Sequence, residues 1–174
     1  MNPIRQELSE IPVCNLLAFI LIIIFIMYNT TFLKTLPCGK GILNSFYSNF
    51  VHLDKIHIFS NISALYFLSR LEKKVGSFVF LYIISGLLIV NTFFTVILNK
   101  VFPKIPCSIG FSGILFGLLG WELLIFKTID PLFILTTLII SVQDSKVSTI
   151  GHATGLVSGM AIAFAQLKIY KIDL

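Results

Sequence analysis

The chain has 174 residues, of which 56% are hydrophobic and 12% charged, and its mean hydropathy is +0.96. Soluble domains carry about 25% charged residues, so this composition indicates a membrane protein. The formal charge of +5 is spread over short connections without a basic stripe, which argues against nucleic-acid binding. The cysteines form no metal-binding pattern, because Cys14, Cys38 and Cys107 lie far apart. We predict neither a metal nor a cofactor.

In chain order, we expect a short polar tail over 1–15, one membrane domain over 16–168 and a second tail over 169–174. Six apolar segments, each bounded by charges, Pro or Gly, are predicted membrane-spanning helices: 16–33, 57–74, 78–98, 111–127, 130–143 and 150–168. The first has no basic region before it and no cleavage site, so it is expected to be a retained span. The polar stretch 34–56 is predicted to be a connection. The fifth segment is short, which predicts a tilted or loosely packed helix.

The parity of six spans predicts a layer of polar residues near one membrane surface. The second, fourth and sixth helices enter from the same face, so their N-terminal ends share one depth. His57 and Asn61 begin the second helix, Ser112 the fourth and His152 the sixth. Polar side chains are costly in lipid, so they usually face the interior of the bundle and indicate a functional site.

Glycines recur at four-residue spacing on two of these helices. Gly113 and Gly117 lie on the fourth helix, and Gly151, Gly155 and Gly159 on the sixth. Such stripes allow close backbone approach, which holds helices together in lipid. Packing is their expected role, and close packing of these two helices would bring the serine to the histidine.

The polar layer has the residue types of a serine hydrolase. We interpret Ser112 as a nucleophile and His152 as its general base, without an acidic third member. His57 and Asn61 share a helical face and are candidates to bind the oxyanion, together with unpaired N–H groups at the start of the fourth helix. His52, at the edge of the preceding loop, is a possible supporting residue. Alternatively, His57 and Asn61 only join two helices.

Four motifs resemble those of the rhomboid intramembrane serine proteases. GFSG at 110–113 resembles the family's GxSG, and GHATG at 151–155 its GHxxG. HLDKIHIFSN at 52–61 is similar to its pattern of two histidines and an asparagine, and EKKVGS at 72–77 to the end of the same helix. The similarity covers residues 46–168.

This resemblance implies a six-helix rhomboid-like bundle with a short central fourth helix and a gate at the fifth. It implies that Ser112 and His152 form a catalytic dyad, that Asn61 and His57 bind the oxyanion, and that Gly110 and Gly113 support the site. The implied substrates are single-span membrane proteins, cut near the membrane edge. The chain departs from the family in two places. Residues 34–56 contain no Trp-Arg pair, and Phe116 stands where bacterial members have Tyr.

With six predicted spans and no seventh, the chain resembles the small fungal Golgi rhomboids. This resemblance implies that the protein is located in the Golgi or another endomembrane if it is eukaryotic, and in the inner membrane if it is bacterial. Two other functions are compatible with the residues. One is a catalytically silent rhomboid-like protein that binds membrane clients. The other is a transporter or channel subunit, although the inverted repeat or midplane charges of that class are not evident. The pattern does not indicate an oligomeric state.

Overall fold

The computed structural model describes residues 9–30, 41–103, 108–127 and 149–170. These residues contain no strand, and their helices are α2 (Pro12–Asn29), α3 (Ile42–Ser48), α4 (Lys55–Val75), α5 (Ser77–Val101), α6 (Ser112–Phe126) and α8 (Thr149–Tyr170). The predicted all-α membrane bundle is confirmed. The predicted fifth span, 130–143, lies outside the described residues, as do Cys38 and Cys107.

Three described helices are long and apolar enough to cross a membrane, namely α2, α5 and residues 150–169 of α8. Helix α4 has 21 residues but carries charged residues at both of its ends. Helix α6 has 15 residues, about 22 Å of helix at 1.5 Å per residue, which is less than the roughly 30 Å of a bilayer core. It is enclosed by protein, because all its residues from Gly113 to Glu122 are buried.

The polar connection predicted over 34–56 contains a short helix that the sequence analysis did not predict. Residues 42–48 form α3, and Ser45 and Ser48 are buried. Serine and asparagine side chains hydrogen-bond readily to nearby backbone groups, and they are typical of turns as well as of helix ends. A short helix that contains them is therefore difficult to recognise from its sequence. The side chains do this here, since Ser48 and Asn49 both donate to the Ser45 carbonyl.

Helix α2 begins at Pro12, inside the stretch predicted to be a tail. The carboxylate of Glu72, at the end of α4, accepts hydrogen bonds of 2.9 Å from the N–H groups of Val13 and Cys14. Proline lacks an N–H, so Glu72 satisfies the donors that the first turn leaves open. A buried carboxylate from another helix therefore caps α2.

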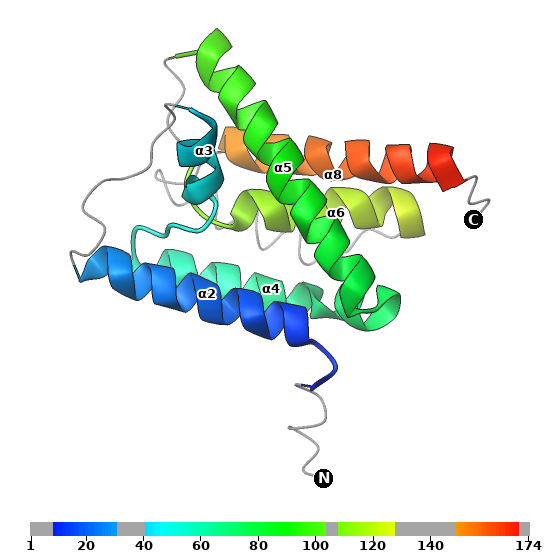
Figure 1. The fold of residues 1–174 in the computed structure, drawn as a ribbon, viewed down its shortest axis with the longest axis horizontal. Helices are drawn as coiled ribbons and strands as arrows, with labels where there is room; N and C mark the ends of the chain where they lie inside the picture. Colours follow the sequence, from blue (N-terminus) through cyan, green and yellow to red (C-terminus); the bar gives the residue numbers. More distant parts are fainter. Residues whose placement is uncertain (1–8, 31–40, 104–107, 128–148, 171–174) are drawn as a thin grey trace.

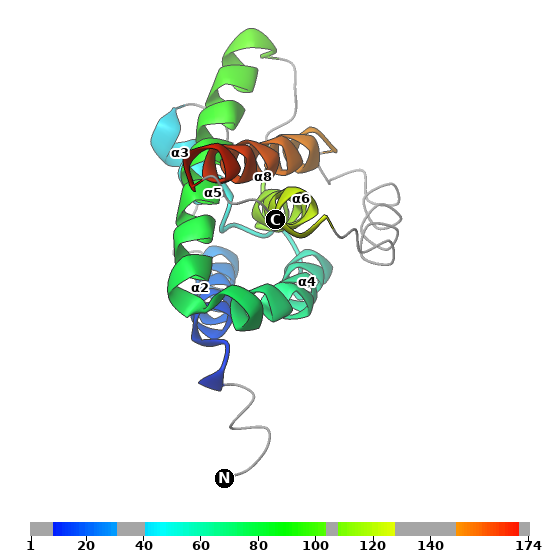
Figure 2. The same cartoon turned by 90° about the vertical axis from the view of Figure 1, so that its right-hand side faces the viewer.

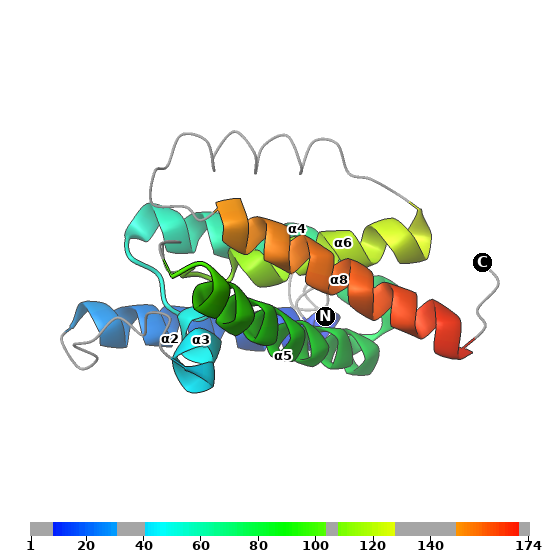
Figure 3. The same cartoon turned by 90° about the horizontal axis from the view of Figure 1, so that it is seen from above.

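Helix α6 is the centre of the arrangement. It lies between α8 on one side and α4 on the other (Figure 2), and α5 crosses this stack at a steep angle, as Figure 1 shows. Helix α2 runs beside α4. Viewed from above, α8 also crosses over α6 (Figure 3). Both helices predicted to carry the serine and the histidine are thus direct neighbours.

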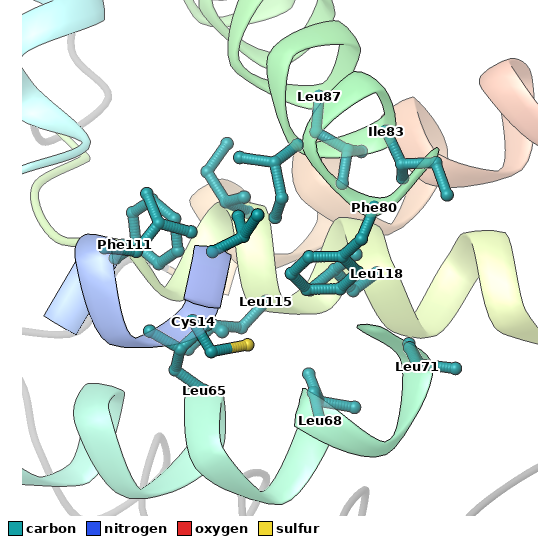
Figure 4. Packing of buried hydrophobic residues seen from close by; sticks show 14 of the residues in the cluster. Cys14, Leu65, Leu68, Leu71, Phe80, Ile83, Leu87, Phe111, Leu115 and Leu118 are labelled. Carbon is teal, nitrogen blue, oxygen red and sulfur yellow. The ribbon is translucent and has the colours of Figure 1, made fainter. Parts of the chain in front are cut away.

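The apolar core fills the space between α4, α5 and α6 (Figure 4). Leucines of α4 and α6 face one another there, and α5 contributes Phe80, Ile83 and Leu87. These side chains are at most 2% exposed, so this part of the bundle is closely packed. The core therefore supports α6 on the side away from α8.

Candidate active site

Ser112 is the first residue of α6, and its hydroxyl contacts the imidazole of His152, the fourth residue of α8. The distance from Ser112 Oγ to His152 Nε2 is 3.0 Å, which is within hydrogen-bond range. His152 is 7% exposed, whereas Ser112 keeps partial exposure. A partly exposed hydroxyl within hydrogen-bond distance of an imidazole is the arrangement of a nucleophile with its base.

Glycine backbones bring the two helices into contact. A Cβ atom on Gly155 would overlap the carbonyl oxygen of Gly113, and one on Gly159 would overlap that of Gly117. The carbonyl oxygen of Gly151 would lie 3.3 Å from a Cβ on Gly113. The serine and the histidine are on the same turns as these glycines, so the backbone contact itself sets the separation of their side chains.

The ring of Phe116 orients the imidazole. It stacks on His152 with a centroid separation of 4.3 Å and an interplanar angle of 22°. Phe116 is one turn after Ser112 on the same helix, so its ring covers one face of the imidazole next to the hydroxyl. Among the described residues no carboxylate hydrogen-bonds to His152. The geometry is that of a dyad.

The loop before Ser112 is held by α3 and α4. Gly110 has φ +106° and its N–H donates to the carbonyl of Ser48 at 2.9 Å. A Cβ atom at Gly110 would lie 2.5 Å from Nε2 of His57. The conformation and the contact both require glycine, and together they place the His57 ring directly against the loop that leads to the serine.

His52, in the segment just before α4, also contacts the loop that leads to Ser112. It is fully buried, its Nε2 lies 3.4 Å from the N–H of Phe111, and its Nδ1 lies 3.2 Å from the carbonyl oxygen of Phe50. Nδ1 therefore carries the proton, and Nε2 accepts. Burial, and then the neighbouring His57, lower the pKa of His52 to about 3. The neutral tautomer is the form that holds the N-cap residue of α6.

The two candidate oxyanion residues lie on the first turns of α4. The N–H of His57 donates to the Asp54 side chain at 2.8 Å, which caps the helix. Asn61 donates through Nδ2 to the His57 carbonyl at 2.8 Å, and its Oδ1 is buried. The His57 ring contacts the His52 ring edge-on, with centroids 4.9 Å apart. Both side chains thus lie at the same end of the bundle as Ser112.

Asn91 of α5 was missed by the sequence analysis. Its Nδ2 would lie 3.1 Å from a Cβ on Gly113, and it donates to Asn49 Oδ1 at 3.0 Å. The signal was present, since an asparagine within an otherwise apolar span is expensive in lipid and indicates a specific contact. It adds a polar wall from α5 beside the start of α6.

The described residues contain no group of three His, Cys, Asp or Glu side chains that could hold a metal ion.

The chain matches the Rhomboid domain family over residues 40–169, which is most of its length. A search of curated proteins found no match. The family and the long apolar helices together identify an integral membrane protein. The motifs that resemble rhomboid sequences lie inside the matched region, and the chain belongs to the rhomboid family.

Proposed function

We propose that the protein is an intramembrane serine endopeptidase that cleaves single-span membrane proteins within or near their transmembrane segments. The observation that carries the proposal is the 3.0 Å contact between Ser112 Oγ and His152 Nε2. Ser112 is the first residue of the buried helix α6, and His152 lies in the first turn of α8, where glycine contacts bring the two helices together. Ser112 and His57 are both partly exposed, as contact with a peptide substrate requires.

The first half of the proposed reaction forms an ester. His152 Nε2 takes the hydroxyl proton as Ser112 Oγ attacks the scissile carbonyl carbon. The carbonyl oxygen becomes an oxyanion, which the N–H of Ser112 and the side chains of His57 and Asn61 stabilise. The C–N bond then breaks, and the imidazolium gives its proton to the leaving amine. The N-terminal fragment of the substrate remains as an acyl ester on Ser112.

The second half of the reaction releases that ester. His152 takes a proton from a water molecule whose oxygen attacks the ester carbonyl, and the same groups stabilise the second oxyanion. The C–O bond to Ser112 breaks, and the imidazolium returns the proton to Oγ. The products are an amine and a carboxylic acid, and the enzyme is regenerated without a metal or cofactor.

Labelling by a fluorophosphonate tests the proposal. The native protein in detergent should label, while Ser112→Ala and His152→Ala should not, and the same two variants should fail to cleave a single-span reporter in vesicles. Ser158→Ala is the matched control, because that serine is buried on α8 and bonded to the Thr154 carbonyl at 2.7 Å. It should label like the native chain.

Native labelling no stronger than that of Ser112→Ala would contradict the proposal. That result, combined with retained binding of single-span proteins, would favour a catalytically silent client-binding protein.

We also propose that the protein is located in the Golgi or another endomembrane if the cell is eukaryotic, and in the inner membrane if it is bacterial. A fluorescent fusion imaged beside compartment markers tests this location.

A further inference from the structure

We infer that the ion pair between Arg70 of α4 and Glu122 of α6 is a positioning device for the active site. It sets the register between α4, which carries the proposed oxyanion residues, and α6, which begins at the proposed nucleophile. The inference deepens the proposed function and rests on it. The pair lies at the end of α6 opposite Ser112, so it acts at a distance, through the helices.

The contact between the two side chains is bidentate. Nη1 of Arg70 bonds Oε1 of Glu122, and Nη2 bonds Oε2 at 3.1 Å. The carboxylate is enclosed, with 8% of the Glu122 side chain exposed, while 38% of the Arg70 side chain is exposed. A planar guanidinium facing a carboxylate with two parallel hydrogen bonds fixes both distance and orientation. The pair therefore resists sliding of one helix along the other.

Apolar packing between the same helices does not have this property. Leu65 and Leu68 of α4 face Leu115 and Leu118 of α6 across the core (Figure 4). Leucine side chains exclude lipid and fill space, but dispersion contacts are not directional and can be remade after a small axial shift. Directional bonds at the end of the interface complement this packing.

The same end of α6 is also joined to α8. Nε1 of Trp121 donates to Oε1 of Gln166 at 2.6 Å. Consecutive residues of α6 thus bond to its two neighbours, Trp121 to α8 and Glu122 to α4. Glu122 follows Ser112 by ten residues, about 15 Å along a helix. A helix is stiff over that length, so a position fixed at Glu122 is transmitted to Ser112.

Loss of the pair should affect the two halves of the site differently. The serine and the histidine stay together, because the glycine contacts hold α6 to α8. Helix α4 becomes free to shift, which displaces His57 and Asn61 from the oxyanion. A misplacement of about 1 Å costs on the order of 100-fold in rate. The expected signature is a lower kcat with an unchanged KM.

Steady-state cleavage of a single-span reporter by the full-length protein in vesicles tests this. R70M and E122M should each lower kcat by about tenfold to 100-fold, with KM within about twofold. The double variant R70M/E122M removes both charges of the pair together, and such replacements of buried pairs often restore stability. This double variant should therefore unfold in dodecyl sulfate like the native chain and still have a low kcat. The exchange R70E/E122R should recover most of the native kcat.

Recovery of both stability and kcat in R70M/E122M would overturn the inference, because the pair would then only neutralise charge.

Two control variants accompany this test. K73Q removes an exposed ion pair of 3.3 Å with Glu10, close to Arg70 on α4, and should leave both kinetic constants unchanged. L21A weakens the core at α2. A kcat as low in L21A as in the pair variants would show that rate only follows stability, which also contradicts the inference.

A distance measurement reads the register without any cleavage. Spin labels at Ile56 of α4 and Ile150 of α8, which are 77% and 39% exposed, report on the catalytic ends of the two helices in a chain whose three cysteines are replaced by alanine. R70M/E122M should broaden or shift the distance distribution, and R70E/E122R should restore it. An unchanged distribution overturns the inference even if the native protein cleaves nothing. A changed distribution without native labelling by fluorophosphonate would instead contradict the proposed function alone.

Discussion

The two sides of α6 are packed by opposite means. Toward α8 the contact is made by backbone, since the glycines leave carbonyl oxygens where side chains would otherwise begin. Toward α4 it is made by leucine side chains in the middle, by the His57 ring against Gly110 at one end and by the Arg70–Glu122 pair at the other, while His52 adds a contact from the segment just before α4. A single short helix is thus joined to one neighbour through backbone contacts and to the other through side chains.

This difference corresponds to a division of the proposed chemistry. The nucleophile and its base must stay within hydrogen-bond distance through the whole cycle, and they lie across the backbone contact. Oxyanion groups must bind a charge that exists only briefly, and they lie across the side-chain contact. The atoms that form each interface therefore determine how much displacement it tolerates.

The largest expected effect is at the backbone contact. Gly155→Ala forces a Cβ onto the Gly113 carbonyl oxygen, so the helices must separate and cleavage should fall by about 100-fold or more. Gly86→Ala is the matched control, because its Cβ would meet only Ile162 Cδ1 at 3.4 Å. Cleavage assays on both variants make the check. Native activity in Gly155→Ala would show that this contact does not position the dyad.

The next effect tests the loop that joins the two interfaces. Gly110→Ala should lower kcat by about tenfold to 100-fold, since the added Cβ displaces the His57 ring. Gly76→Ala has the same kind of strain, at φ +84°, but nothing within 4 Å of its Cβ. It should lose about 1–3 kcal/mol of unfolding free energy and keep its kcat. Equal loss of kcat in the two variants would attribute the effect to backbone strain rather than to the histidine.

The side-chain interface should tolerate more. Leu68→Ala creates a cavity beside α6 and should cost about 2–5 kcal/mol of unfolding free energy. Its kcat should stay within about threefold of native below the unfolding transition, because the terminal ion pair still sets the register. Dodecyl sulfate titration and cleavage assays provide the two readings. A kcat as low as that of Gly155→Ala would remove the distinction between the two interfaces.

The smallest effect is a pH dependence at His52. Its pKa is lowered from 6.5 to about 3, so between these values the unfolded chain binds a proton that the folded chain does not. The stability that neutral His52 contributes is complete above about pH 6.5 and is lost as the pH falls toward 3. Between pH 7 and 5, the unfolding free energy of the native protein should therefore fall more steeply than that of His52→Gln. His57 and His152 are present in both chains, so parallel slopes would refute this role of His52.

Span parity predicted the location of the polar layer because depth depends only on the order and number of helices. Ser112, His152, His57 and Asn61 do lie at the same end of the bundle. Glycine spacing predicted which helices approach closely, since a four-residue repeat defines one face. These features are local or periodic, and a sequence expresses both directly.

Pairings between particular residues were not predictable in this way. The bond from Glu72 to the start of α2 spans 58 and 59 positions of sequence, and that from Arg70 to Glu122 spans 52. Each depends on how far one helix is rotated and shifted against another, which periodicity does not define. Helix α3 was missed for a different reason. Its polar side chains hydrogen-bond to nearby backbone, and they interrupt the apolar periodicity by which a helix is recognised in a sequence.

The cap on α2 has a consequence for biogenesis. The ribosome completes α2 well before it adds Glu72, so the newly made first span reaches the bilayer with its leading amides unbonded. Until α4 arrives, water or lipid headgroups must bond those amides, which keeps that end of the span at the membrane surface. Insertion of α4 then delivers the carboxylate and closes a loop of nearly sixty residues. Final docking of the first span is therefore a late step of assembly, dependent on a residue translated after it.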